Sequence, residues 1–395
     1  MPDGENVVGE NSTETRAAIS VVRSIHEIAP ADWDACAGAA NPFLSHAFLS
    51  ALEDSGSVKA ETGWLPQHLV YADDEDRIAG IVPLYLKGHS QGEYVFDWGW
   101  ADAYERAGGD YYPKLLSAVP FTPVTGPRLL CHPEADREAV NSILIGGLIE
   151  ITRRFEVSSL HVNFLPEAQW NALGEAGFLK RIGLQFHWHN DGYQHFGDFL
   201  DALSSRKRKA IRKERKASAE SGLTIRKLTG SAIEPRHWDA FYQFYTDTSD
   251  RKWGSAYLTR SFFDLLGARM ADRVLLVIAE MDGTPVAGAL NLIGDDTLYG
   301  RNWGCIADFK FLHFELCYYQ AIDFAIERGL EWVEAGAQGQ HKIQRGYLPR
   351  YTRSCHLIPS RSFSDAVGDF LRRETEQMAY EKEALENQSP FRSEG

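Results

Sequence analysis

Side chains that can move protons or bind negative charge are concentrated between Tyr299 and Tyr347. Carboxylates and imidazoles can accept a proton, whereas arginine and lysine can stabilise a developing anion. Most of these side chains fall where predicted strands and helices end, which favours a functional site over the alternative of an aromatic core with a solvated charged rim. The chemically capable residues of the stretch are Arg301, Trp303, His313, Glu315, Glu334, Gln338, His341, Lys342, Arg345 and Tyr347.

A predicted β-α-β unit positions these side chains. Residues 298–304 form a short aromatic segment that ends in glycine, as a strand leaving a sheet often does. Residues 312–327 carry apolar side chains at three- and four-residue steps, which predicts a helix, and Gly329 follows as its C-cap. Residues 331–336 predict a buried strand that enters a glycine-rich loop. Ligand sites are common where such a loop leaves a sheet.

A strongly basic segment lies near the middle of the chain. Eight of the thirteen residues from 204 to 216 are lysine or arginine, and the run predicts a helix capped by Ser204 or Ser205. In an acidic protein such a local field attracts phosphate, a nucleotide, tRNA or anionic lipid. The alternative is a solvated helical face. The candidates for holding a phosphate-bearing substrate are Lys207, Arg208, Arg212 and Arg215.

The composition is that of an ordinary globular protein of 395 residues with a net charge of −14, which excludes a nucleic-acid coat protein. Five scattered cysteines without a CxxC pair argue against structural zinc and disulfides. His187 and His189 share a strand face, but no third ligand is suggested, so we predict no metal site. With no signal peptide and no apolar run long enough to span a membrane, we expect a cytoplasmic protein, with contact to the inner membrane face left open.

The chain contains a weak internal repeat. Residues 69–86 and 275–293 both predict a hairpin with an acidic turn, and each is followed by a predicted aromatic strand, the first of which is 94–100. We predict two copies of one α/β unit joined by the basic helix. The predicted parts are a disordered arm (1–20), an N-terminal unit (21–195), a connector (196–222), a C-terminal unit (223–368) and a charged tail (369–395).

The order hairpin, aromatic strand, long helix and strand resembles the GNAT acyltransferase fold. Two such units with the segment SSRKRKAIRKERK resemble FemAB-type transferases. The phrases FDWGWADAYER, PFTPVTGPRLL, HFELCYYQAIDFAIERGL and EAGAQGQHKIQRGY resemble a FemAB-like subgroup labelled as predicted N-acyltransferases or peptidoglycan biosynthesis/recognition proteins. The resemblance covers about residues 21–365. It implies an α/β (α+β) fold of two tandem GNAT-like units.

The family resemblance implies transfer of an acyl or aminoacyl group from an activated carrier to an amine, which could belong to a cell-envelope precursor. GNAT enzymes wrap the pyrophosphate of CoA in a glycine-rich loop, but residues 307–313 contain no glycine at that place. This favours FemAB-type chemistry with aminoacyl-tRNA. No cofactor is expected. Acyl-CoA, acyl carrier protein or aminoacyl-tRNA could be the donor, and the acceptor is expected to be a phosphate-bearing or lipid-linked molecule.

The resemblance also suggests roles for individual residues. Glu315, Glu334 and His313 are candidates for the base that takes a proton from the amine, and Tyr347 could donate one. Charge stabilisation is expected from Arg301, His341 and Lys342, which are preferred over any particular carboxylate. Substrate contacts are expected from Trp303, Gln338 and, on the acceptor side, Asp97, Trp98, Trp100 and Tyr104.

Two other functions remain open from the sequence. One is a non-catalytic protein that binds a cell-envelope precursor. The other is an enzyme that transfers a fatty acyl group to a lipid amine, for which the aromatic residues between 94 and 121 would be suited. The sequence does not indicate the oligomeric state.

Overall fold

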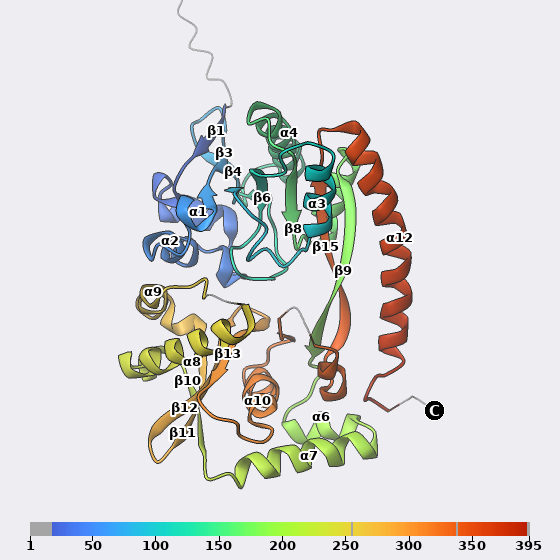
Figure 1. Cartoon of the computed structure of the whole chain (residues 1–395). Helices are drawn as coiled ribbons and strands as arrows, with labels where there is room; N and C mark the ends of the chain where they lie inside the picture. Colours follow the sequence, from blue (N-terminus) through green and yellow to red (C-terminus); the bar gives the residue numbers. More distant parts are fainter. Residues whose placement is uncertain (1–17, 254–255, 337–338, 393–395) are drawn as a thin grey trace, which may run out of the picture.

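The computed structural model describes residues 18–253, 256–336 and 339–392. Eleven strands of this part of the chain form one mixed sheet, which runs in Figure 1 from β10 and β11 at the lower left, through β9 and β15 at the right, to β8 and β6 in the upper middle. In sheet order the strands are β10 (Thr224–Leu228), β11 (Val274–Met281), β12 (Thr284–Ile293), β13 (Thr297–Cys305), β14 (Trp332–Glu334), β9 (Leu179–His189), β15 (Leu348–Leu357), β8 (Leu160–Asn163), β6 (Lys114–Ser117), β5 (Tyr85–Lys87) and β2 (Trp64–Pro66).

A second sheet and a set of helices cover the large sheet. The four-stranded sheet consists of β1 (Ala18–Val22), β3 (His68–Ala72), β4 (Ile78–Val82) and β7 (Leu130–Cys131). The helices are α1 (Pro30–Ala37), α2 (His46–Asp54), α3 (Trp98–Arg106), α4 (Arg137–Arg154), α5 (Glu167–Glu175), α6 (Phe196–Ala202), α7 (Ser205–Ala219), α8 (Pro235–Trp253), α9 (Arg260–Met270), α10 (Leu312–Phe314), α11 (Gln320–Glu327) and α12 (Arg361–Glu386).

The two predicted units share strands instead of forming two separate sheets. Strand β15 belongs by sequence to the predicted C-terminal unit, yet it pairs antiparallel with β8 and with β9 of the predicted N-terminal unit. Strand β9 in turn pairs with β14 through His187 and Glu334. Helix α12 runs alongside β9 and β15 on the right of Figure 1, so the end of the chain also packs on both parts.

The hydrophobic core crosses between the two predicted units as well. Helix α2 packs against helix α9, with the rings of Phe48 and Phe262 5.7 Å apart. Phe43, just before α2, packs edge-on against Tyr299 of β13 at 5.3 Å. Phe43 and helix α2 therefore complete the core beside the strand that carries Arg301.

Both predicted hairpins form, as β3–β4 and β11–β12, but they lie in different sheets. The aromatic strand predicted for 94–100 is wrong, because α3 begins at Trp98. Trp98 is exposed while Trp100 is buried, and the buried Asp97 bonds to side chains instead of joining a sheet. The two halves of the repeat therefore diverge at this point, because Trp98 begins a helix whereas its counterpart Trp303 lies in strand β13.

The ends of the chain differ from the predicted boundaries. Residues 18–20 of the predicted arm are part of β1, which pairs with β3, and the rest of the arm lies outside the described residues. Most of the predicted charged tail is the second part of helix α12. The basic helix forms as predicted: it is α7, with Ser204 at its N-cap position.

One face of the large sheet is unusually polar. Residues two apart on a strand share a face, and cross-strand partners here are Lys87 with Lys114, His161 with His356, and His187 with Glu334. Two N-terminal segments, 88–97 and 120–128, lie against this face. Arg181 donates to the carbonyl of Phe96 at 2.8 Å, and Gln185 donates to that of Pro123 at 2.8 Å.

Candidate functional site

A buried ion pair lies where strands β13 and β14 diverge. These parallel strands pair only from Thr297 to Tyr299, after which β13 continues to Cys305 while β14 ends at Glu334. Nη2 of Arg301 lies 3.1 Å from Oε2 of Glu334, and the two side chains are only 6% and 7% exposed. The structure thus brings two predicted site residues together, but as each other's counter-charge.

Aromatic rings and a histidine surround this ion pair. The guanidinium of Arg301 lies 4.7 Å from the ring centre of Phe43 and 5.2 Å from that of Tyr299. Nε2 of His187 is 3.9 Å from the other carboxylate oxygen of Glu334. Burial lowers the pKa of His187, which favours its neutral form. His187, considered above only as a metal ligand, therefore belongs to the surroundings of Glu334.

Lys342 lies close enough to Arg301 for their charges to interact. It sits in the 3-10 turn Gln340–Arg345, and its ammonium donates to the carbonyls of Ala335 at 2.6 Å and Gly336 at 3.0 Å. Burial lowers the pKa of Lys342 to about 8, so this amine loses its proton far more readily than an exposed lysine.

His341 is the most accessible of the predicted catalytic residues near the ion pair. Its side chain is exposed, and its Nε2 lies 2.9 Å from the hydroxyl of Tyr318. Partial burial and the charges of Arg345 and Lys342 lower the pKa of His341, so the imidazole is neutral at pH 7 and can accept a proton. His313 lies beside it, with ring centres 6.1 Å apart, and packs on Trp303 at 5.2 Å.

Glu315 faces the basic helix α7. It begins the π-helical segment Glu315–Tyr319, an irregular turn of a kind that is frequent at functional sites. Its Oε1 accepts from Arg215 at 3.2 Å and from Gln320 at 2.8 Å, while Oε2 is buried without a partner among the described residues. Burial raises the pKa of Glu315, and Arg215 opposes that rise.

The inner face of α7 is fixed to the site by a second set of contacts. Arg215 also binds Asp323 at 2.7 Å. Glu214, the one acid of the basic run, accepts from Arg345 at 3.0 Å and from the hydroxyl of Tyr319. Because Arg345 closes the turn that carries His341 and Lys342, α7 is tied to the elements on which the candidate catalytic groups sit.

Every exposed charged residue of α7 is a cation. Arg208 pairs with Asp201 at 2.6 Å and Lys207 is half-buried, so two of the four predicted phosphate-binding residues, Arg208 and Arg215, are held by acids. Arg212 alone of the four is exposed. It belongs to a stripe about 15 Å long, here called the α7 stripe, made of Arg206, Lys209, Arg212, Lys213 and Lys216. In the described part of the chain only Lys216 has an acidic partner, Glu220 at 3.6 Å.

The predicted acceptor residues lie elsewhere on the same sheet face. Asp97 accepts from Lys114 at 2.5 Å and from Tyr111 at 2.7 Å, and Lys114 also binds Glu93 at 2.8 Å. Burial alone would lower the pKa of Lys114, but Glu93 and Asp97 raise it above its usual value. Lys114 lies on β6, which is separated from β13, the strand of Arg301, by five strand spacings of about 4.8 Å.

The aromatic members of the predicted acceptor side have different surroundings. Trp98 is 45% exposed, whereas Trp100 is buried and lies 4.9 Å from the ring of His356. Tyr104 packs on Phe363 at 4.8 Å. Trp100 and Tyr104 therefore join the packing of α3 against the C-terminal part of the chain.

Tyr347 is fully buried, and its hydroxyl donates to the carbonyl of Tyr318 at 3.3 Å, so it packs as a core residue with no exposed group for proton transfer. Gln338 lies outside the described residues.

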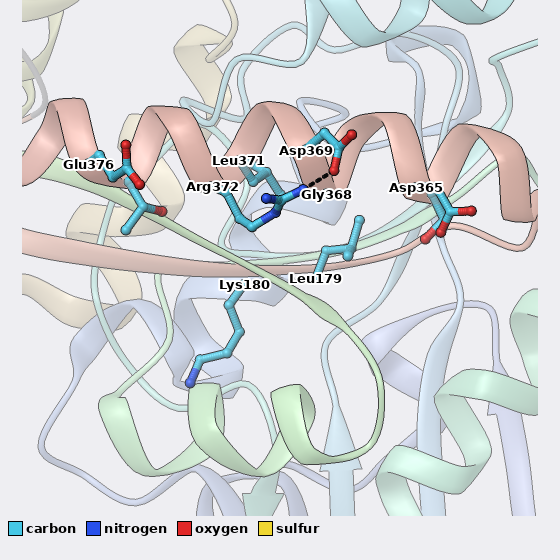
Figure 2. A pocket seen from close by; sticks show the side chains of 10 residues that line it. Leu179, Lys180, Asp365, Gly368, Asp369, Leu371, Arg372 and Glu376 are labelled. Atoms are coloured by element: carbon cyan, nitrogen blue, oxygen red, sulfur yellow. Dashed lines mark hydrogen bonds and ion pairs between the residues drawn. The ribbon is translucent and has the colours of Figure 1, made fainter.

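A surface groove lies away from all of these groups. It has a volume of about 700 Å³ and runs between Leu179 and Lys180 at the start of β9 and helix α12, where Asp369 pairs with Arg372 (Figure 2). None of the predicted site residues lines it. In the described residues no cluster of three histidine, cysteine or acidic side chains could hold a metal ion, and no helix is long and apolar enough to cross a membrane.

Comparisons with known proteins agree with this architecture. A family model described as FemAB-like, peptidoglycan biosynthesis/recognition, matches residues 24–393. The solved structure of FemX resembles this chain with a TM-score of 0.53 at 11% identity over 86% of this chain and 98% of its own. A C-terminal DUF2156 domain from Agrobacterium fabrum gives 0.51 at 10% identity over 87% and 96% of the two chains.

A tandem GNAT protein from the clavulanic acid biosynthesis pathway gives a TM-score of 0.47 at 12% identity, over 87% of this chain and 98% of its own. No curated protein sequence matches significantly. Identities this low show the fold alone, and the predicted fold of two tandem GNAT-like units is confirmed.

Sequence reasoning missed several groups that the fold assembles. Lys114, Glu93 and Tyr111 were not singled out, although a lysine beside the apolar run Leu115–Leu116 was a usable signal. Tyr318 and Glu214 are recognisable only once α7 and the π-helical segment pack together.

Proposed function

Because the chain belongs to the FemAB-like family, we propose that it is an N-acyltransferase that moves an acyl or aminoacyl group from an activated carrier to an amine of a cell-envelope precursor. The observation that carries this proposal is the set of proton-accepting and cationic groups gathered at the ends of β13 and β14. They are the neutral, exposed His341, the low-pKa Lys342 and the Arg301–Glu334 pair.

Acyl transfer to an amine needs a proton acceptor and a group that stabilises the negative carbonyl oxygen, and these residues can provide both. The amine nitrogen attacks the carbonyl carbon of the donor ester or thioester, forming a C–N bond, and its proton passes to His341. Negative charge then develops on the carbonyl oxygen, where the ammonium of Lys342 is suited to stabilise it. The C–O or C–S bond to the carrier breaks, and the carrier leaves with the proton returned by the imidazole.

The α7 stripe supports a polyanionic carrier. Five cations within about 15 Å form a local positive field on an acidic protein. On the inner face of the same helix, Arg215 binds Glu315 and Glu214 binds Arg345. The loop before α10, residues 306–311, contains no glycine to wrap a pyrophosphate. We therefore favour aminoacyl-tRNA as donor over a CoA thioester, with an acidic acyl carrier protein as the alternative.

The proposal is tested by reconstitution with purified protein. Mixed aminoacyl-tRNAs, acyl carrier protein thioesters and acyl-CoAs are each offered with a lipid-linked or UDP-linked muropeptide or with a lipid amine, and products are identified by mass spectrometry. We expect transfer from aminoacyl-tRNA to the muropeptide, and at least about a 100-fold loss in His341→Ala, the scale of a general base. Transfer only from acyl-CoA to a lipid amine would replace the proposed substrates, and full activity of the His341 variant would remove its assigned role.

A binding protein without catalysis is the second candidate. One observation favours it: the guanidinium of Arg301 and the ammonium of Lys342 are already bonded to Glu334 and to backbone carbonyls. Under this alternative, muropeptide raises the melting temperature of the protein while no donor gives product.

A further inference from the structure

An irregular segment of the N-terminal part, Gly88–Asp97, is fixed to the large sheet by buried charges. Lys114 binds Ser90 at 2.7 Å, Glu93 at 2.8 Å and Asp97 at 2.5 Å, so three residues of the segment are held by one ammonium group. Lys87 lies 4.0 Å from Glu93. Removing one member of such a buried set is costly, because its partner is left as an uncompensated charge.

Tyr94, between these attachment points, has a strained backbone. Its φ is +61°, a left-handed conformation that a bulky residue rarely adopts. A strained backbone conformation persists only where surrounding contacts hold it in place, and such conformations are concentrated at functional sites. Here the flanking Glu93 and Asp97 are the residues that hold the chain in place.

The side chain of Tyr94 reaches the C-terminal part of the molecule. It lies near Arg301, Tyr245 and Tyr257, close enough for their charges to interact. The neighbouring carbonyl of Gly92 accepts from the amide of Phe121 at 3.2 Å, and Phe121 stacks on Tyr257 with ring centres 5.1 Å apart at 12°. The segment therefore brings a phenol of one predicted unit into the neighbourhood of Arg301 in the other.

The Tyr94 hydroxyl is available to a ligand. The residue is half-buried, and its hydroxyl forms no hydrogen bond with any residue that the structure describes. Burial raises the pKa of Tyr94, so the phenol keeps its proton and acts as a donor throughout the neutral range. A hydroxyl donor near Arg301 that no described residue occupies is suited to hydrogen-bond a carbonyl oxygen of a ligand.

We propose that Tyr94 is a catalytic residue of the acyl-transfer site, whose hydroxyl donates a hydrogen bond to the reacting carbonyl oxygen, and that Lys114 is a positioning residue that holds it there. The inference rests on the proposed function, because it assigns a role in that reaction. It adds to the site a residue that lies more than 200 positions before Arg301 in the chain.

The test is Tyr94→Phe, which removes only the hydroxyl, with Tyr71→Phe as the matched control. Tyr71 is a half-buried tyrosine of strand β3 in the other sheet. A donor to the developing oxyanion acts mainly in the transition state, so we expect kcat to fall by about tenfold to a hundredfold with little change in KM. The urea midpoint and the activity of Tyr71→Phe should match the wild type.

Lys114→Ala tests the positioning role by a second readout. We expect faster proteolytic cleavage within Gly88–Asp97 and a fall in kcat similar to that of Tyr94→Phe. A protected segment with full activity would overturn the role of Lys114, and wild-type kcat in Tyr94→Phe would overturn that of Tyr94. If the wild type transfers nothing from any donor, the proposed function fails and this inference fails with it. If the wild type is active and Tyr94→Phe is equally active, only the inference about Tyr94 is refuted.

Discussion

The Arg301–Glu334 pair allows a quantitative test of the reasoning about the site. Two unit charges 3.1 Å apart attract each other by about 5 kcal/mol at an effective dielectric constant near 20. In Glu334→Gln the guanidinium keeps its buried position but loses its counter-charge. We therefore expect the free energy of unfolding to fall by about 3–5 kcal/mol, so the glutamine variant is not a conservative change here. The same argument applies to Arg301→Ala, which we expect to destabilise the fold as well as to reduce activity.

The double variant separates pairing from simple damage. Arg301→Met removes the cation and should cost about as much as Glu334→Gln, because it leaves a buried carboxylate. Arg301→Met combined with Glu334→Gln buries no net charge, so its loss should be smaller than the sum of the two single losses by about 2 kcal/mol or more. Urea titration followed by tryptophan fluorescence measures all four proteins.

An exposed ion pair supplies the matched control. Arg77 binds Asp73 at 3.0 Å in the acidic turn after β3, with the arginine side chain 61% exposed. Asp73→Asn should leave the urea midpoint unchanged, because solvent screens such pairs. If the coupling between Arg301 and Glu334 were below about 0.5 kcal/mol, the claim that the pair lies in a dry interior would be refuted.

Three other predictions follow from individual contacts. Folding lowers the pKa of Lys342 from 10.5 to about 8, so between these pH values the unfolded chain binds more protons than the folded one. The free energy of unfolding should therefore rise with pH over this window, by up to about 3 kcal/mol relative to Lys342→Met. Urea midpoints from about pH 7 to 10.5 measure this. Lys209→Glu combined with Lys213→Glu should weaken tRNA binding and make its logarithmic salt dependence shallower, measured by filter binding between about 50 and 200 mM salt. An unchanged slope would show that the α7 stripe is only a solvated face. A Cβ on Gly304 would lie 2.1 Å from the carbonyl oxygen of Phe244 in α8, so Gly304→Ala should lower the melting temperature clearly, whereas Gly99→Ala on α3 meets nothing within 4 Å and should not.

The sequence predicted local structure well where one pattern dominated. Periodic apolar spacing predicted the helix that continues through α11, and the density of lysine and arginine predicted α7 with its Ser204 cap. Both hairpins were predicted from an acidic turn between apolar runs. In each case the signal lies within about twenty neighbouring residues.

The pairing of charges could not be predicted, because it depends on contacts between distant segments. Arg215 was predicted to hold a phosphate-bearing substrate together with Arg212, but Glu315 and Asp323 hold its guanidinium against the protein. Asp97 was expected in a strand, yet Lys114 draws it into a buried cluster and α3 starts beside it. A helical wheel gives the faces of a helix but does not say which face meets an acid a hundred residues away.

The insertion of β15 between β8 and β9 has a consequence for how the protein is made. During synthesis, β9 emerges about 160 residues before Leu348, the first residue of the strand that must lie beside it. At a translation rate of about 5–20 residues per second, synthesis takes roughly ten to thirty seconds to pass from β9 to β15, and this edge of β9 stays unpaired during that time. During that interval the nascent N-terminal part carries an open, hydrogen-bonding strand edge of the kind that invites aggregation. We expect fragments that end before β15 to be recovered mainly as inclusion bodies, and the last eighth or so of the gene to control the yield of folded protein.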